Sequence, residues 1–519
     1  MPSQNHTRFM ATTSPLGNQL QLMRINNIQR LSLVLLFLIV SRQVTAADDS
    51  KFPATLQQYE EQLIQISNEV SDSVVMIAAI HATNAEKTPT ERFEEIFHPE
   101  ASQLPARIGM GVIVENSDNQ LLVLTTTHLV EPIISRQRQQ NPFDLFVKFS
   151  TNEIAHASLV AADPRSELAV LKIDPEVELK TNSNFTPVQF AETTNTVKGS
   201  ILVALGDPWE MAKDGQSGLS AAIVTDMQRS LELDSDRTLA ERTLHELGTL
   251  LTLDLPVRFA SHGTPLFTIQ GEFAGLVHSQ KVFSQQGEAV SFAVPNSEGF
   301  RRIVKELKQG YEVEYGFLGI SAETSSTDAF DNISLTTPQS TAAIVLRVPE
   351  NSPAANAGMK RDDLILRVND QIIETNEDLV REITLLKPSE RVELMLYRDG
   401  EGTQSVTATL GKWPIYDDSL IVTTQQRHPD WRGLHVDYPT SRKRYLRDRF
   451  LSVYPTGVVI VSIEEGSIAD RAGLQVGQFI VKVNGQSVET PQQFQDAVAD
   501  QQEVNISLAS GTEITISND

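Results

Sequence analysis

Short apolar runs separated by turn-forming residues dominate the chain between about residue 73 and residue 300. They read "SVVMIAAI", "IGMGVIVEN", "QLLVLTTTHLV", "FDLFVKFS", "LAVLKID", "SILVALGD", "EFAGLVHS" and "AVSFAVP". Helical segments do not alternate with them. Many short strands without alternating helices predict an antiparallel β-barrel or β-sandwich.

Helical periodicity flanks this β-rich region on both sides. Residues 54–70 place several apolar side chains on one side of a helix, and these are Leu63, Ile64, Ile66 and Val70. A second helix is expected over residues 297–308, with Asn296 or Ser297 as its N-cap. The β-rich region is therefore predicted to be a domain with a helix at each end.

The C-terminal third contains an internal repeat. The segment "ENSPAANAGMKRDDLILRVNDQIIET" from Glu350 aligns without gaps with "EGSIADRAGLQVGQFIVKVNGQSVET" from Glu465. Each copy predicts a short helix, an Ala-Gly turn, a strand and an Asn-Asp or Asn-Gly β-turn. The positions of the first copy that recur in the second are Ser352, Ala354, Ala357, Gly358, Ile365, Val368, Asn369, Gln371, Glu374 and Thr375. Two copies of one module are therefore predicted.

The N-terminus predicts a secretory signal. Basic residues precede an apolar run over residues 31–40, and a "VTA" sequence follows that ends at Ala46. This order is typical of a cleaved signal peptide, and the apolar run is too short to cross ~30 Å of hydrocarbon as a helix. We expect residues 1–46 to be an N-terminal extension and signal peptide, no stable membrane insertion, and an exported, periplasmic mature protein. An uncleaved anchor and a start at Met23 remain alternatives.

Composition narrows the classes of function. The chain has 519 residues, a formal net charge of −24 and no cysteine. Its length suggests about three domains. The acidity argues against general binding to nucleic acid, because phosphates would repel it. The lack of cysteine excludes disulfides and thiolate chemistry, and we expect no cofactor.

Three segments of the β-rich region carry candidate chemistry. "TTTHLV" places His128 directly after an apolar strand, and "DPRSELAVL" places Glu167 directly before another. The third segment, "FASHGTPLF", surrounds Ser261 and His262 with small residues ahead of a short apolar strand. Small residues around one functional side chain indicate a tight turn that presents it. The residues alone do not decide which of the two the turn presents.

Together with the repeated modules, these segments resemble the HtrA (DegP-like) family of trypsin-fold serine proteases. The family's "TNxHV" segment, which carries the triad His, is similar to "TTTHLV", and its "DPxxDxAxL" segment is similar to "DPRSELAVL" with Glu167 in place of the acid. The segments "LGDPWE" and "AVSFAVP" are similar to "xGNPxG" and "GxxFAIP" of the family. The resemblance implies a mainly β fold: a trypsin-like double β-barrel over residues 60–308, then PDZ domains over residues 315–412 and 430–519. It also implies that His128 and Glu167 occupy triad positions.

The nucleophile turn departs from the family pattern "GNSGGxL". Alignment on "PLF" and on "GEFAG" places Ala260 on the first Gly, Ser261 on Asn and His262 on the catalytic Ser, whereas Gly263 is retained. An imidazole cannot form the acyl-serine ester. Ala260 and Gly263 form the oxyanion region, which the loss of Gly at 260 puts in doubt. Ser261 could act only after a register shift, because its Cα would start about 3.8 Å from the nucleophile's place.

Two interpretations of this cleft remain. The residues His128, Glu167 and His262 would bring together two imidazoles and a carboxylate, a donor set that binds Zn²⁺ or Fe²⁺ elsewhere. The alternative is a pair of hydrogen-bonded histidines that fill an inactive cleft. We favour the second, so no metal site is predicted.

Each module is expected to bind peptides at the loop before its first strand. In PDZ domains such a loop points successive backbone N–H groups at a terminal carboxylate, and the neighbouring strand edge pairs with the peptide. "YGFLGI" supplies Tyr315, Gly316, Phe317, Leu318, Gly319 and Ile320. The looser counterpart "RGLHV" supplies Gly433, Leu434, His435 and Val436. The alternative is that the modules only pack against neighbours or assemble subunits.

The leading functional hypothesis is an exported HtrA-like protein without proteolytic activity. It would bind unfolded proteins or exposed C-termini through its PDZ domains, as a chaperone, adaptor or regulator. One alternative is an ATP-independent serine endopeptidase in protein quality control. Another is an inactive scaffold subunit that co-assembles with an active paralogue. Family members build trimers from the barrel domain, so the resemblance also implies a homo-trimer, a higher oligomer or such a hetero-assembly.

Overall fold

The computed structural model places most of the chain beyond residue 51. It describes residues 52–81, 88–97, 107–117, 120–134, 143–174, 185–192, 196–230, 242–259, 261–282, 289–327, 339–446 and 452–517. The predicted signal peptide and Ala260 lie outside these residues. The chain divides into two compact units, Met1–Gln62 and Leu63–Asp519, and the barrels and modules described below belong to the second.

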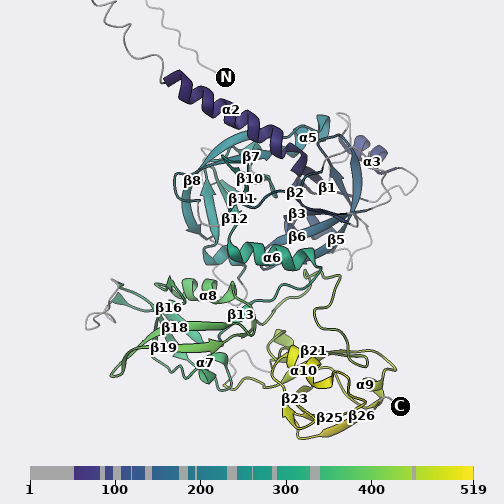
Figure 1. Cartoon of the computed structure of the whole chain (residues 1–519), viewed down its shortest axis with the longest axis vertical. Helices are drawn as coiled ribbons and strands as arrows, with labels where there is room; N and C mark the ends of the chain where they lie inside the picture. Colours follow the sequence, from purple (N-terminus) through teal and green to yellow (C-terminus); the bar gives the residue numbers. More distant parts are fainter. Residues whose placement is uncertain are drawn as a thin grey trace, which may run out of the picture. The chain divides into compact units, whose positions relative to one another are not determined.

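Six antiparallel strands close into a first barrel (Figure 1). Around the barrel they are β1 (Val74–His81), β2 (Arg107–Ser117), β3 (Gln120–Thr126), β6 (Leu168–Ile173), β5 (Ile154–Asp163) and β4 (Phe143–Lys148). Strand β1 reads as a continuous apolar run because both of its faces are buried, up to the exposed His81. Helices η1 (Ser71–Ser73), α3 (Pro89–Phe97) and α4 (Thr127–Ile134) accompany this barrel in the chain.

A second closed barrel follows in the chain. Around it the strands are β10 (Pro265–Thr268), β11 (Phe273–Val282), β12 (Ala289–Pro295), β9 (Leu250–Leu253), β8 (Gly218–Arg229) and β7 (Ile201–Gly206). Its helical segments are α5 (Pro208–Asp214), η4 (Leu244–Leu247) and η5 (Val257–Phe259). The prediction of a β-barrel domain is therefore confirmed.

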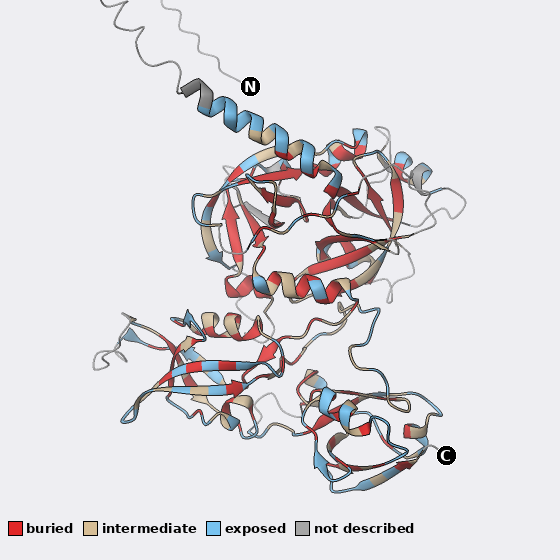
Figure 2. Ribbon diagram, in the orientation of Figure 1, coloured by how far each residue is buried: buried red, intermediate tan, exposed pale blue. Residues whose placement is uncertain are grey.

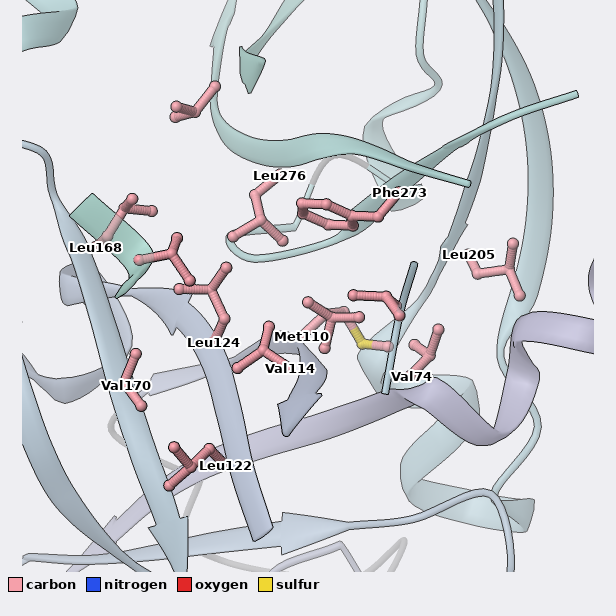
Figure 3. Packing of buried hydrophobic residues seen from close by; sticks show 14 of the residues in the cluster. Val74, Met110, Val114, Leu122, Leu124, Leu168, Val170, Leu205, Phe273 and Leu276 are labelled. Carbon is pink, nitrogen blue, oxygen red and sulfur yellow. The ribbon is translucent and has the colours of Figure 1, made fainter. Parts of the chain in front are cut away.

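Three apolar clusters hold the two barrels. One is confined to the first barrel and its helix α4, and another is confined to the second barrel. The largest cluster takes residues from both, among them Val74, Met110, Leu168, Phe273 and Leu276 (Figure 3). Figure 2 shows the buried strands as red bands through both barrels. This shared core fixes the two barrels against each other along the region where the candidate site lies.

Helices flank the barrels as the periodicity predicts. Helix α2 (Phe52–Val70) buries Ile66 and Val70 in the shared core. Ile64, which was expected on the buried side, is 55% exposed. Helix α6 (Glu298–Lys308) has Ser297 as its N-cap, with the Ser297 hydroxyl accepting from the Phe300 N–H, so the predicted start is confirmed.

The repeated modules have the same strand order. The first sheet contains β14 (Ser321–Thr324), β15 (Ala343–Arg347), β16 (Leu364–Val368), β18 (Arg391–Arg398) and β19 (Gly402–Thr409), with β17 (Gln371–Ile372) beside β16. The second contains β21 (Leu434–Asp437), β22 (Val458–Ile463), β23 (Phe479–Val483), β25 (Glu503–Leu508) and β26 (Glu513–Ser517), with β24 (Gln486–Ser487) beside β23. The matching sheets support the interpretation of the repeat as one duplicated module.

The identical residues of the repeat have matching structural roles. Ser352 and Ser467 cap helices α7 (Pro353–Asn356) and α9 (Ile468–Arg471). Thr375 and Thr490 likewise cap helices α8 (Asn376–Thr384) and α10 (Pro491–Val498). Two of the recurring residues, Ser352 and Thr375, are therefore ones whose side chains satisfy free N–H groups at a helix start.

The remaining short elements lie around the modules. They are β13 (Gly316–Phe317), β20 (Gly411–Lys412) and η7 (Lys443–Tyr445). In the part of the chain that the structure describes, no helix is both long enough and apolar enough to cross a membrane.

Candidate functional site

The turn that carries His262 is tied to both barrels. Its own ends are joined by a hydrogen bond from the Thr264 N–H to the Ser261 carbonyl, at 3.1 Å. The Met110 N–H, from the first barrel, donates to the His262 carbonyl at 2.9 Å. The Gly263 N–H, in turn, donates to the Val277 carbonyl of the second barrel at 2.9 Å. The backbone of the turn that the resemblance assigns to a nucleophile is thus held in place by hydrogen bonds to both barrels.

Gly263 is required by the geometry of this turn. Its φ is +78°, and a Cβ there would lie 2.0 Å from the Met110 carbonyl oxygen. The resemblance places the neighbouring Thr264 on the last Gly of the family pattern, and its side chain is fully buried. A Cβ on Gly206 would lie 2.8 Å from the Thr264 Cγ2, so Gly206 leaves space for this larger residue.

His128 and His262 meet directly. Their rings stack with centroids 4.0 Å apart and planes inclined by 21°. His128 is in the first turn of helix α4, directly after strand β3, whereas His262 comes from the turn before β10. Among the described residues, Nδ1 of His262 is buried without a hydrogen-bond partner. The structure therefore brings together the two histidines that the resemblance places at the base and nucleophile positions, and the contact is between two rings.

Glu167 is held close to His128 through the backbone. Its carbonyl accepts from the Thr127 N–H at 2.9 Å, and its own φ is +56°, in the left-handed region that non-glycine residues rarely adopt. The carboxylate, however, bonds to a different histidine: Oε2 lies 2.6 Å from Nε2 of His278. His278 sits in strand β11 at a register shift between Val277 and Ser279. The carboxylate of Glu167 thus orients His278.

A fourth histidine completes the cluster. His245, in η4, places Nε2 3.6 Å from Oε2 of Glu167 and 2.9 Å from the Ser166 carbonyl. Its Nδ1 lies 3.2 Å from the Thr249 hydroxyl. The rings of His245 and His278 have centroids 4.5 Å apart. Only His128 and His262 of these four histidines were predicted as site residues.

No motif pointed to His245 or His278. "TLHELGT" and "GLVHSQ" each contain a single histidine beside apolar residues, and such a histidine is usually structural. Their spacing along the chain carries no signal, because the barrel closure and not a local repeat brings them to Glu167. A count of histidines in the barrel domain was the only available hint.

Burial sets the protonation of the cluster. Burial is the main cause that lowers the pKa of His245, to about 3, and His278 adds to the shift. Burial and the neighbouring His128 lower the pKa of His262, also to about 3. The pKa of His128 is lowered by burial and by the positive charge of Arg107. Both His245 and His262 are therefore neutral at neutral pH.

Glu167 is ionised in the same surroundings. Burial by itself would raise the pKa of this carboxyl, but the hydrogen bond from His278 and the nearby imidazoles of His245 and His278 hold it at about 2. The cleft therefore combines one carboxylate with the uncharged imidazoles of His245 and His262. That combination provides lone pairs rather than an acidic proton at neutral pH.

The predicted peptide-binding loop of the first module is ordered by packing. Tyr315 is buried, and its hydroxyl donates to the Asp163 carboxylate. Gly316 and Phe317 form strand β13, which pairs with β20. The Leu318 carbonyl accepts a hydrogen bond from the Ala354 N–H at 3.0 Å, and Gly319 has a φ of +76°. Of the predicted residues, Leu318, Gly319 and Ile320 form the turn next to edge strand β14.

The second module contains the same loop, but the loop ends earlier in the chain than predicted. The Ala469 N–H donates to the Arg432 carbonyl at 3.2 Å, and Gly433 has a φ of +80°. Arg432 and Gly433 therefore correspond to Leu318 and Gly319. The residues after Gly433, which were predicted as loop, lie in the edge strand β21, namely Leu434, His435 and Val436. The loop signal in "RGLHV" is thus shorter than the motif suggested.

Comparison with family models identifies both parts of the chain. Residues 109–276 match a model described as a trypsin-like peptidase domain. Residues 316–410 and residues 459–509 each match a model described as a PDZ domain. The fold is accordingly mainly β, with a trypsin-like domain of two closed six-stranded barrels and two PDZ domains.

Curated relatives extend over both parts. A protein of Halomonas elongata named "Probable periplasmic serine endoprotease DegP-like" is 24% identical over 395 residues, which are 76% of this chain and 74% of the relative. A protein of the same name from Pseudomonas putida is 26% identical over 469 residues, 86% of this chain and 88% of the relative.

Solved structures show a looser overall similarity. One described as "HtrA-type protease AlgW with tripeptide" is 18% identical, with a TM-score of 0.47, over 68% of this chain and 98% of that chain. The serine endoprotease from Yersinia pestis is 19% identical, with a TM-score of 0.41, over 67% of this chain and 97% of that chain.

Proposed function

We propose that this chain no longer cleaves peptides by the serine mechanism. The proposal starts from the support that these matches give to the HtrA/DegP-like family of periplasmic serine proteases. The observation that carries the proposal is the stacking of His262 on His128 at 4.0 Å. In a trypsin-like protease the base imidazole takes a proton from a serine hydroxyl. Here a second imidazole occupies the position that the resemblance assigns to that serine.

The acid position supports the same conclusion. The triad acid holds the base imidazole in the tautomer and orientation that the reaction needs, but Glu167 bonds to His278 at 2.6 Å. Among the described residues, no hydroxyl group hydrogen-bonds to His128. In this proposal the nucleophile is replaced and the acid no longer pairs with His128, while the hydrogen-bonded turn around Gly263 persists.

The retained activity that we propose is peptide binding in the periplasm. The loop of Leu318, Gly319 and Ile320 precedes the outer strand β14, which is the arrangement that lets a peptide add to a sheet edge while backbone N–H groups bind its terminal carboxylate. The client would be an unfolded protein or an exposed C-terminus. The protein would act as a chaperone, adaptor or regulator.

The proteolytic part is tested on the intact chain. It is incubated with unfolded casein and with a fluorophosphonate probe that labels activated serines. We expect neither cleavage nor labelling. Cleavage or labelling that Ser261→Ala abolishes would overturn the proposal and support a serine endopeptidase with a shifted register, which the names of the relatives favour.

The peptide-binding part is tested separately. Short fluorescent peptides with an apolar C-terminal residue are expected to bind as free acids and not as amides. Gly319→Ala should weaken binding, because a Cβ there would lie 2.9 Å from the Ser352 Cβ. Gly433→Ala, whose Cβ would lie 2.3 Å from the Ser467 Cβ, is the matched variant in the second module. Equal binding of acids and amides would leave a scaffold that co-assembles with an active paralogue as the better explanation.

A further inference from the structure

Three side chains from separate elements converge beside the stacked pair. They are Glu167 directly before β6, His245 in η4 and His278 in β11. One oxygen or nitrogen atom of each lies within 4.8 Å of the others. Among the described residues, these three form the one group of at least three such donors. The barrel closure brings them together from distant parts of the chain.

The distances match a small transition-metal ion. Zinc takes imidazole nitrogen at about 2.0–2.1 Å and carboxylate oxygen at about 2.0–2.2 Å in a tetrahedral arrangement, so its ligand atoms stand roughly 3.3 Å apart. Oε2 of Glu167 lies 3.6 Å from Nε2 of His245 and 2.6 Å from Nε2 of His278. An ion would replace the proton that Glu167 and His278 now share and would move both atoms by less than about 1 Å.

Metal binding would change the tautomer of His245, because Nε2 lies 2.9 Å from the Ser166 carbonyl, which can only accept, and therefore carries the proton in the metal-free chain. Its Nδ1 faces the Thr249 hydroxyl at 3.2 Å, and this hydroxyl donates its own proton to the Leu244 carbonyl at 3.0 Å. Once that proton has moved from Nε2 to Nδ1, the Thr249 oxygen can accept from Nδ1–H, and the lone pair of Nε2 becomes available to an ion. Metal-bound histidines are typically oriented by such a hydrogen bond on the other nitrogen.

The surrounding backbone also holds the donors in place. The Leu244 N–H donates to the Arg165 carbonyl at 2.8 Å, and this bond joins η4 to the segment that carries Glu167. His245 and His278 are buried, with 1% and 8% of their surface exposed, while the Glu167 side chain is 30% exposed. The two imidazoles are thus buried, and the carboxylate is the part of the cluster that is partly exposed to solvent.

We propose that Glu167, His245 and His278 bind one Zn²⁺ ion, with a fourth coordination position left for water or another ligand. Two imidazoles and one carboxylate are a ligand set that zinc uses in sites with an open position. This set differs from the one considered from the sequence, since it shares Glu167 but replaces His128 and His262. Those two rings stack on each other and serve as internal controls.

The experiment uses the full mature chain without a histidine tag, after treatment with EDTA and removal of the chelator. Zn²⁺ is titrated by calorimetry, and Co²⁺ is titrated as a visible-absorption probe of coordination. We expect one equivalent of saturable Zn²⁺ and the intense bands of four-coordinate Co²⁺. No saturable binding would overturn the proposal.

Variants locate the ion. Glu167→Gln, His245→Gln and His278→Gln should each weaken Zn²⁺ binding by at least ~100-fold, and Thr249→Val should weaken it by ~10–100-fold. His128→Ala and His262→Ala should retain the wild-type affinity. Loss of binding in these two, together with retention in His278→Gln, would overturn the assignment.

A measurement on the wild-type chain covers the case in which a variant does not fold. X-ray absorption of the Zn²⁺-loaded protein should show two imidazole ligands per ion. A zinc environment without imidazole, or one with water and carboxylate alone, would overturn the proposal. Since the proteolysis assays do not depend on zinc, failure here leaves the proposed function standing.

Discussion

The imidazoles of His128 and His262 lie face to face, with ring centroids 4.0 Å apart and an angle of 21° between the planes. Burial lowers the pKa of both rings, which is what allows two imidazoles to pack so closely without charge repulsion. In this cleft a ring fills the space that a serine hydroxyl needs. Restoring serine-protease activity would therefore require more than removing the His262 ring.

We predict that His262→Ser alone does not restore a protease. The carboxylate of Glu167 bonds to His278. It would therefore not hold the imidazole of His128 in the tautomer that a serine nucleophile needs. Loss of the correct tautomer in a serine protease lowers kcat about 10⁴-fold. Labelling by a fluorophosphonate probe checks the prediction. Stoichiometric labelling of His262→Ser would show that the acid–base pair is intact.

Acid should destabilise the metal-free barrel domain through His245. Its pKa is about 3 in the folded chain, below the ordinary 6.5. The unfolded chain therefore binds the proton first as the pH falls, and stability is lost between pH 6.5 and pH 3. Between pH 7 and pH 5 this residue alone accounts for about 2 kcal/mol.

Urea unfolding at the two pH values measures this effect. His245→Gln keeps a polar side chain but removes the titration, so its free energy of unfolding should fall by about 2 kcal/mol less than that of the wild type over the same pH interval. The same pH dependence in both proteins would mean that His245 is protonated when folded.

Gly263→Ala should be severely destabilising. At φ +78° an alanine is strained, which costs about 1–2 kcal/mol, and its Cβ would also lie 2.0 Å from the Met110 carbonyl oxygen. We expect a total loss above about 3 kcal/mol, because the turn cannot move without breaking its hydrogen bonds to both barrels.

A matched control separates strain from steric clash. Gly199 has a φ of +92°, and a Cβ there meets nothing within 4 Å. Gly199→Ala should therefore cost only the conformational part, about 1–2 kcal/mol. Similar urea midpoints for the two variants would contradict the close approach of the barrels at Gly263.

Zinc should stabilise the fold if it binds as proposed. At a free Zn²⁺ concentration 100-fold above Kd, binding to the folded chain alone adds about 2.7 kcal/mol to the free energy of unfolding. EDTA should reverse the gain, and His278→Gln should not show it. A gain of equal size in His278→Gln would place the ion elsewhere.

Local sequence patterns predicted most of the fold. The apolar runs become barrel strands, and Ser297 caps helix α6 as expected. The repeat becomes two sheets with one strand order, and Ser352 and Thr375 have the same helix-capping roles as Ser467 and Thr490. Caps, turns and strand alternation depend on residues a few positions apart, so the sequence carries them directly.

The loop of the second module shows where a motif misleads. "RGLHV" resembles the loop of the first module by composition, yet His435 and Val436 pair with strand β22. The loop ends at Gly433, because the left-handed turn at Arg432 and Gly433 is followed at once by the strand. Composition alone does not distinguish the last loop residue from the first strand residue.

The sequence by itself determined that a histidine stands on a tightly built turn before strand β10, in a double-barrel domain followed by two PDZ domains. Only the tertiary structure decided which side chains contact one another around that histidine. Glu167 and His278 are 111 residues apart, and they meet because the two barrels pack along one shared core. The register shift at His278 also decides its direction, since a shift of one residue turns a side chain to the opposite face of a strand. Such long-range closure leaves no periodic trace in the chain.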